Sequence, residues 1–283
     1  MIAEQITDPL AHHGEGPIWD PHAQALRWVD MLAGDVLTLR SGEEADRCHV
    51  GDVAAAIRPR TGGGLVVAVE RGFLLVWPDG RMGAVHEAFT ASDVRMNDGG
   101  CDPQGRFYCG SMAYDASPGR GALYRFDPDG TITLVLDDVT ISNGMAWSAD
   151  GGLLYYIDSP TGRVDAFSFD PDRADLSRRR PVVRIPEDAG MPDGMAVDAD
   201  GGLWVALWGG GAVHRYTPDG RLDTVVRLPV TQVTACAFGG ADLETLFITT
   251  SRQRVEAGEQ PAAGALFTVT PGVRGLAPHM FAG

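Results

Sequence analysis

The hexapeptide Asn143-Gly-Met-Ala-Trp-Ser148 has five related copies elsewhere in this chain, and the repeat they form decides the fold. A small residue usually follows the first position, and an apolar residue or cysteine occupies the fifth. The copies begin at positions 15, 53, 97, 143, 193 and 234, a spacing typical of repeat architectures. The other five copies are Glu15-Gly-Pro-Ile-Trp-Asp20, Val53-Ala-Ala-Ala-Ile-Arg58, Asn97-Asp-Gly-Gly-Cys-Asp102, Asp193-Gly-Met-Ala-Val-Asp198 and Thr234-Ala-Cys-Ala-Phe-Gly239.

A second marker, a turn containing proline, aspartate or glycine, follows a later strand in most units. Proline fixes one turn dihedral and glycine supplies a positive φ, so the pattern predicts β-turns. Short runs of strand-forming residues precede and follow these turns. The turns lie at 77–80, 126–130, 169–172, 216–220 and 269–272, and the runs at 26–29, 64–69, 74–77, 106–109, 153–157, 203–207 and 246–249.

Six units of four short strands predict an all-β fold, a six-bladed β-propeller, with residues 1–283 in a single domain. No amphipathic helical pattern supports a helical solenoid, and a β-sandwich does not explain six copies in register. The first strand of each blade is expected to line the central channel. We further expect the residues before Glu15 and after Gly275 to close the ring by pairing in one blade.

Composition excludes several partners and chemistries. The net charge of −15 and the pI of about 4.7 do not suit nucleic acid or an anionic membrane surface, which bind positive footprints. Lysine is absent, so Schiff-base chemistry and phosphate loops are excluded. With no apolar span, no signal-like start and no CxxC pair, we expect a cytoplasmic protein whose cysteines are small buried side chains: Cys48, Cys101, Cys109 and Cys236.

The first position of the hexapeptide carries the candidate site. Six-fold pseudosymmetry places these residues at one height on the channel wall, and four of the six carry carboxylate or amide oxygens: Glu15, Asn97, Asn143 and Asp193. The chain has only two asparagines, and both lie in this ring. Converging oxygens repel unless a cation lies between them, and an all-oxygen set suits Ca²⁺, Mg²⁺ or Mn²⁺. The alternative is that these groups cap strands or bind channel water.

Several motifs, in order across essentially the whole chain, resemble the SMP-30/gluconolactonase/luciferin-regenerating family, with a leaning toward its bacterial sugar lactonase branch. They are Gly14-Glu-Gly-Pro17, Arg95-Met-Asn-Asp-Gly99, Gly105-Arg-Phe-Tyr-Cys-Gly-Ser-Met112, Ser142-Asn-Gly144, Tyr155-Tyr-Ile-Asp158, Pro192-Asp-Gly194 and Trp204-Val-Ala-Leu-Trp-Gly209.

The resemblance implies a role for each matching residue. Glu15, Asn143 and Asp193 match the metal ligands, and Asp193 also matches the catalytic base. Arg95, Asn97 and Asp115 match substrate-binding residues. Asp115 lies in a loop that is shorter than in vertebrate members. The implied cofactor is one divalent metal ion in the channel, with calcium favoured over zinc, manganese, magnesium or iron.

The expected activity is hydrolysis of a small-molecule sugar lactone, such as gluconolactone or a pentonolactone, to the aldonic acid. The alternatives are a phosphotriesterase or paraoxonase-like esterase and a non-catalytic propeller scaffold. The roles of four side chains stay open: Thr234 contacts substrate or packs, His12 and His13 reach the rim or solvent, and Trp208, like Tyr114, lines the pocket mouth or packs on the outer face.

Overall fold

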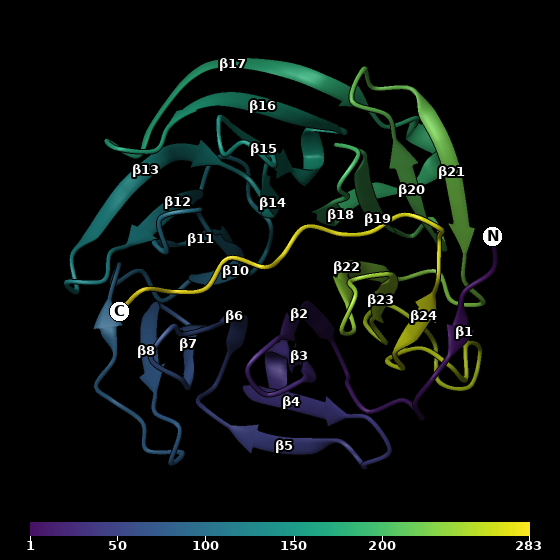
Figure 1. Cartoon of the computed structure of the whole chain (residues 1–283), viewed down its shortest axis with the longest axis horizontal. Coiled ribbons are helices and arrows are strands. Elements are labelled where there is room, and N and C mark those ends of the chain that lie inside the picture. Colours follow the sequence, from purple (N-terminus) through teal and green to yellow (C-terminus); the bar gives the residue numbers. More distant parts are fainter.

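The computed structural model describes residues 1–283 and consists of six four-stranded antiparallel sheets arranged as blades in a ring (Figure 1). The predicted six-bladed β-propeller is confirmed. The helices are three 3₁₀ turns, none of which is long and apolar enough to cross a membrane. These turns are η1 (Met31–Ala33), η2 (Ser159–Thr161) and η3 (Glu187–Ala189).

Each blade is a meander that runs from the ring's centre outward. Blades 1 to 3 comprise β2 (Gly14–Asp20), β3 (Ala25–Asp30), β4 (Asp35–Arg40) and β5 (Asp46–His49); β6 (Ala54–Pro59), β7 (Leu65–Val69), β8 (Gly72–Val76) and β9 (His86–Glu87); and β10 (Val94–Cys101), β11 (Phe107–Ala113), β12 (Gly121–Phe126) and β13 (Ile132–Val139).

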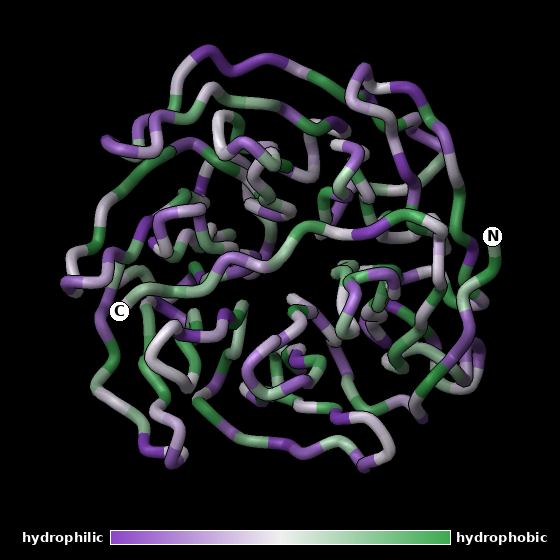
Figure 2. The backbone as a smooth tube through the Cα atoms, in the orientation of Figure 1, coloured by the Kyte–Doolittle hydropathy of each residue, from purple (hydrophilic) through white to green (hydrophobic).

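Blades 4 and 5 continue the same pattern, and blade 6 takes its outermost strand from the N-terminus. They comprise β14 (Ser142–Trp147), β15 (Leu153–Asp158), β16 (Arg163–Asp170) and β17 (Asp175–Arg184); β18 (Met191–Val197), β19 (Leu203–Trp208), β20 (Ala212–Tyr216) and β21 (Leu222–Arg227); and β22 (Val233–Gly239), β23 (Thr245–Thr250), β24 (Phe267–Val269) and β1 (Glu4–Gln5). Hydrophilic residues concentrate toward the outer strands, as the purple stretch of β17 shows (Figure 2).

Every hexapeptide forms the innermost strand of its blade, and each carries a β-bulge near its first position. In β14, for example, Asn143 pairs with Ile157 and Met145 with Tyr156, which leaves Gly144 unpaired. A bulge bends the strand and re-aims a side chain. It also brings blades together: a Cβ on Gly144 would lie 2.7 Å from the carbonyl oxygen of Asp193 in the next blade. The repeated small residue is therefore a packing requirement.

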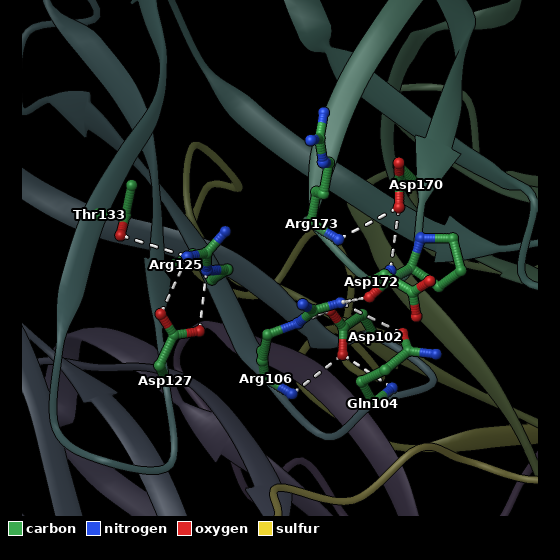
Figure 3. A network of polar contacts seen from close by, with 10 residues as sticks. Asp102, Gln104, Arg106, Arg125, Asp127, Thr133, Asp170, Asp172 and Arg173 are labelled. Atoms are coloured by element: carbon green, nitrogen blue, oxygen red, sulfur yellow. Dashed lines mark hydrogen bonds and ion pairs between the residues drawn. The ribbon is translucent and has the colours of Figure 1, made fainter.

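An aspartate at the sixth position of the hexapeptide fixes the turn into the second strand in three of the blades. Asp102 accepts hydrogen bonds from the backbone N–H groups of Gln104 and Arg106, as in an Asx-turn, and pairs with the Arg106 guanidinium (Figure 3). Arg106 Nη2 also donates to the carbonyl oxygen of Pro171, 2.7 Å away, which ties blade 3 to blade 4. Asp20 and Asp198 make the corresponding turn contacts in blades 1 and 5.

Ring closure differs in part from the expectation. The N-terminal strand β1 pairs with β24, with Glu4 opposite Thr268, and so closes the ring in blade 6. The residues after Gly275 do not pair in that blade. Because β1 already holds the outermost position, the chain leaves the turn after β24 and crosses the middle of the ring to the far side, as the yellow segment in Figure 1 shows.

This C-terminal segment, residues 275–283, covers the face where the inner strands end. Gly275 bridges to Asp198, and Phe281 bridges to Arg60. Leu276, Pro278 and His279 line a cavity of about 120 Å³ together with the ends of the inner strands. The segment therefore lies across one end of the channel.

The cysteines are buried in three of four cases. Cys101, Cys109 and Cys236 are buried free thiols, and burial raises the pKa of Cys236 to about 12. Cys48 lies exposed on the outer strand β5, so the expectation that all four are buried is wrong for this residue. Outer strands face solvent, and the sequence of β5 has no clear alternation to mark its faces.

We predict that Phe281→Ala lowers the free energy of unfolding by about 3 kcal/mol, the usual cost of removing a buried phenyl ring. Phe281 is 1% exposed and stacks on Phe126 with ring centroids 5.3 Å apart. Urea unfolding of both proteins measures the difference. A loss below about 0.5 kcal/mol, the range of exposed substitutions, would show that the segment is not packed as described.

Candidate functional site

A cavity of about 770 Å³ opens at the other end of the channel, where the inner strands begin. Four of the six ring residues line it, and all four are buried: Glu15 on β2, Asn97 on β10, Asn143 on β14 and Asp193 on β18. Their positions follow from the shared bulge, which orients the same position of each inner strand. The predicted convergence of these oxygen-bearing side chains is thus present.

The remaining two ring positions have structural roles. Val53 is 2% exposed and belongs to the largest hydrophobic cluster, between the first three blades. Thr234 is fully buried, and its hydroxyl donates to the carbonyl oxygen of Gly14 at 2.6 Å. That bond joins blade 6 to blade 1. Of the two roles left open for Thr234, packing therefore holds, and its hydroxyl does not line the cavity.

A directional chain of hydrogen bonds orients both asparagine amides. Arg95 Nη1 donates to Asn97 Oδ1 at 2.6 Å, and Asn97 Nδ2 donates to Asn143 Oδ1 at 2.9 Å. Asn143 Nδ2 in turn donates to Ser159 Oγ at 2.8 Å, and Ser159 donates to the carbonyl oxygen of Pro192 at 2.7 Å. A guanidinium can only donate and a carbonyl can only accept, so the two ends fix the direction. Asn143 Oδ1 keeps a free lone pair.

Arg95 has further donors to offer. Its hydrogen bonds to Asn97 Oδ1, to the Met96 carbonyl and to Met31 Sδ all come from Nη1. The Nε and Nη2 groups make no hydrogen bond within the chain, although the side chain is buried and lines the cavity. These N–H groups are therefore available to a ligand oxygen.

The two carboxylates of the cavity are destabilised in their ionised form. Burial and the charge of Asp98 raise the pKa of Glu15 to about 8. Burial and the charge of Glu15 raise the pKa of Asp193 well above its ordinary value. In both cases Arg95 offsets the shift only in part, so the ionised pair lacks sufficient positive charge around it.

Asp98 is a buried carboxylate that the sequence pattern missed. It occupies the second hexapeptide position, where the other five copies carry glycine or alanine. Burial raises its pKa, and its Oδ1 accepts a hydrogen bond from the N–H of Gly99 at 2.7 Å. The sequence signal for Asp98 is that it is the one charged residue among small ones at this position.

Four residues whose positions the sequence left open lie at the mouth of the cavity. Tyr114 and Trp208 both line the cavity rather than packing on the outer face. His12 and His13 line it as well; His13 is buried, its Nδ1 lies 2.9 Å from Ser251 Oγ, and burial lowers its pKa to about 3. His13 is therefore a neutral part of the wall.

Asp115 is not brought into the cavity. It is exposed, and its carboxylate accepts hydrogen bonds from the N–H and hydroxyl groups of Ser117 in its own turn. Its neighbours Tyr114 and Ala116 do line the cavity. The Asp115 carboxylate is bound within its own short loop, so the expected substrate contact is not supported.

The residues at the cavity floor fit a divalent cation. The structure contains no group of three or more His, Cys, Asp or Glu side chains placed to hold a metal. The donor set consists instead of two carboxylates, Glu15 and Asp193, with the oriented amide oxygen of Asn143. Hard cations take such oxygen ligands, and a charge of +2 would relieve the repulsion that raises both carboxyl pKa values.

Sequence comparison decides the family. The profile described as "SMP-30/Gluconolactonase/LRE-like region" matches residues 13–252. The chain belongs to this family. Regucalcin from Danio rerio is 37% identical over 279 residues, which cover 95% of both chains. A Bacillus subtilis family member, YvrE, named provisionally as a sugar lactone lactonase, is 35% identical over 100% of this chain and 99% of its own.

Solved structures of the family have the same fold. A luciferin-regenerating enzyme superposes with a TM-score of 0.92 at 30% identity and covers 99% of both chains. Regucalcin from Agrobacterium tumefaciens, described as a calcium-binding protein, superposes with a TM-score of 0.91 at 26% identity, over 97% of this chain and 95% of its own.

We predict that Ser159→Ala lowers the affinity of the cavity for Ca²⁺ by about tenfold or more, the usual effect of removing a partner that orients a metal ligand. The change leaves Asn143 Nδ2 without its acceptor, so the amide is oriented from one side only, by Asn97 Nδ2. Calorimetric titration with Ca²⁺ measures the affinity. Thr161→Ala is the matched control, because that hydroxyl in the same turn bonds only to the carbonyl oxygen of Asp158. Equal effects of the two changes would contradict the orienting role.

Proposed function

We propose that this protein is a lactonase, a carboxylic-ester hydrolase that opens a sugar lactone to the aldonic acid with the help of one divalent cation. The observation that carries the proposal is the cavity floor, where Glu15, Asn143 and Asp193 converge beside the unused donors of Arg95. Family membership supports the same reading, since the family profile is named in part for gluconolactonase and one relative is provisionally named as a sugar lactone lactonase.

The proposed cation ligands are Glu15, Asn143 and Asp193. Three protein ligands leave coordination positions open for water and substrate, as in catalytic rather than structural metal sites. Calcium is the favoured ion, because every donor is oxygen and a structural relative is described as calcium-binding. When bound, the cation would supply Lewis acidity toward the lactone carbonyl oxygen.

Asp193 is the proposed general base. Its carboxylate is buried and lines the cavity floor, where the cation would keep it ionised and so able to accept a proton. It would take a proton from the attacking water while the water oxygen bonds to the carbonyl carbon. As the ring C–O bond breaks, the same proton returns to the departing ring oxygen, which leaves as a hydroxyl. The products are balanced: one water is consumed and one carboxylic acid is formed.

Arg95 is the proposed substrate-binding residue, and Asn97 is proposed to position it. The free Nε and Nη2 groups of Arg95 point a fixed positive charge at ligand oxygens, including the oxygen on which negative charge develops. Asn97 already uses its Oδ1 on Arg95 and its Nδ2 on Asn143, so its main effect is to hold both partners in place.

Two other readings are less well supported. A non-catalytic scaffold does not require a cavity with oriented amides, unused guanidinium donors and carboxylates of raised pKa. A phosphotriesterase or paraoxonase-like esterase would use a similar cavity, and no feature of this one favours it. Rates on aldonolactones compared with aryl esters and organophosphates separate these activities.

We predict that Asp193→Asn reduces kcat on a hydrolysed sugar lactone by about 10²–10⁴-fold, the usual contribution of a general base. The amide keeps an oxygen for the cation but cannot accept the proton. Steady-state kinetics at saturating Ca²⁺ measures the loss.

Asp129→Ala is the matched control for that experiment. This exposed aspartate accepts a hydrogen bond from the Thr131 N–H in the turn between β12 and β13, outside the cavity. It also loses one carboxylate and one turn contact, and should keep wild-type kcat. If the Asp193→Asn variant kept the wild-type kcat, Asp193 would not be the general base.

A further inference from the structure

The cavity wall carries a charge balance opposite to that of the whole protein. Acidic residues outnumber basic ones by 38 to 23 in the chain. Among the residues that line the cavity, the only carboxylates are Glu15 and Asp193, whereas three arginines line it: Arg95, Arg252 and Arg254. With a divalent cation at the floor, the cavity would be net positive. A positive, concave surface on an acidic protein selects for anionic ligands.

The three arginines of the cavity form no direct ion pair within the chain, although the charges of Glu15 and Asp193 act on Arg95. Twelve of the 23 arginines form ion pairs with carboxylates, and the three of the cavity are not among them. Arg252 donates only to backbone carbonyls, from Nε to Ala263 at 3.0 Å and from Nη2 to Pro9 at 2.8 Å. Arg254 is exposed and makes no hydrogen bond or ion pair at all, so its donors are free.

The loop that carries Arg252 and Arg254 is held in position at the rim. Ser251 is fully buried and bonds to His13 of the cavity wall, while its Oγ also accepts the N–H of Gln253 at 3.0 Å. A turn from Arg252 to Val255, with an N–H to carbonyl distance of 3.2 Å, places Arg254 at φ +59°. An arginine in this left-handed conformation is disfavoured by its Cβ, so asparagine or glycine would suit the turn better.

We propose that the cavity selects sugar lactones that carry an anionic group, a carboxylate or a phosphate, at the end remote from the lactone carbonyl, and that Arg254 is the main residue that recognises it. This inference rests on the proposed lactonase function and deepens it. With the carbonyl at the buried floor, the remote end of the ligand extends toward the exposed rim. A guanidinium is suited to this task because its planar N–H groups pair with two oxygens of one carboxylate or phosphate.

The rest of the rim does not compete for such a group. Its other exposed side chains include Leu32, Tyr114 and Met191, which carry no charge at neutral pH. Arg252 is anchored by carbonyls and reinforces the positive potential, whereas Arg254 is free to close on the ligand. The selectivity is therefore expected to appear in KM rather than in kcat.

The test compares three lactones: D-glucono-1,5-lactone, its 6-phosphate, and a D-glucarolactone that carries a carboxylate. The wild-type protein should show a kcat/KM at least about tenfold higher for one or both anionic lactones than for the neutral one. Arg254→Gln should lower the anionic kcat/KM by about fivefold to tenfold, a typical range for one charge-assisted contact near a surface, and leave the neutral lactone unchanged. The anionic lactone with the higher kcat/KM shows whether a carboxylate or a phosphate is the recognised group.

Arg178→Gln is the matched control. Arg178 is also exposed, has φ +53° and forms no ion pair, but it lies on the outer strand β17. It loses the same charge from the same backbone conformation and should behave as wild type. Equal kcat/KM for neutral and anionic lactones in the wild-type protein, or equal losses on all three lactones in Arg254→Gln, would overturn the proposal.

A binding measurement separates this proposal from the lactonase function itself. Calorimetric titration should show that wild-type protein binds 6-phosphogluconate, glucarate or both more tightly than gluconate and that Arg254→Gln loses the difference. If no lactone is hydrolysed but this difference persists, the lactonase function fails and anion selection stands. If lactones are hydrolysed and the wild-type protein binds all three acids equally, anion selection fails alone.

Discussion

Ionised carboxylates that share a buried site repel each other and lose hydration, and Glu15 and Asp193 share such a site in the channel of the propeller. Burial raises the pKa of both and of Asp98, and repulsion between carboxylates adds to the shifts of Glu15 and Asp193. A fold that keeps such groups together needs a compensating positive charge. Arg95 supplies only part of it, so the arrangement is consistent with a cation at the floor of the cavity.

The propeller delivers these groups through repetition of one local feature. A bulge near the first hexapeptide position accompanies a side chain that lines the cavity in four blades, and small residues at the second position in five blades let the blades approach. The hydrogen-bond chain from Arg95 to the Pro192 carbonyl then sets the orientation of each amide. Secondary structure thus determines where the oxygens lie, and the polar chain determines which atom faces the cavity.

The sequence predicted the blades, the ring and the convergence of four of its members because each depends on a repeated local pattern. Features without a repeat were not predictable in this way. The path of residues 275–283 depends on which terminus completes blade 6, and the loop at 251–255 has no counterpart in other blades. The Asp115 carboxylate bonds within its own turn because Ser117 is two residues away. The resemblance to proteins with longer loops did not predict this local contact.

Glu15, Asn143 and Asp193 are proposed to hold one cation together. Anomalous X-ray diffraction from crystals of the protein grown with Mn²⁺, a probe for a hard-cation site, tests this directly. We expect one strong anomalous peak in the channel within coordination distance of an oxygen from each of the three side chains. A well-ordered channel with no peak among these residues, or with the peak held by other side chains, would contradict it.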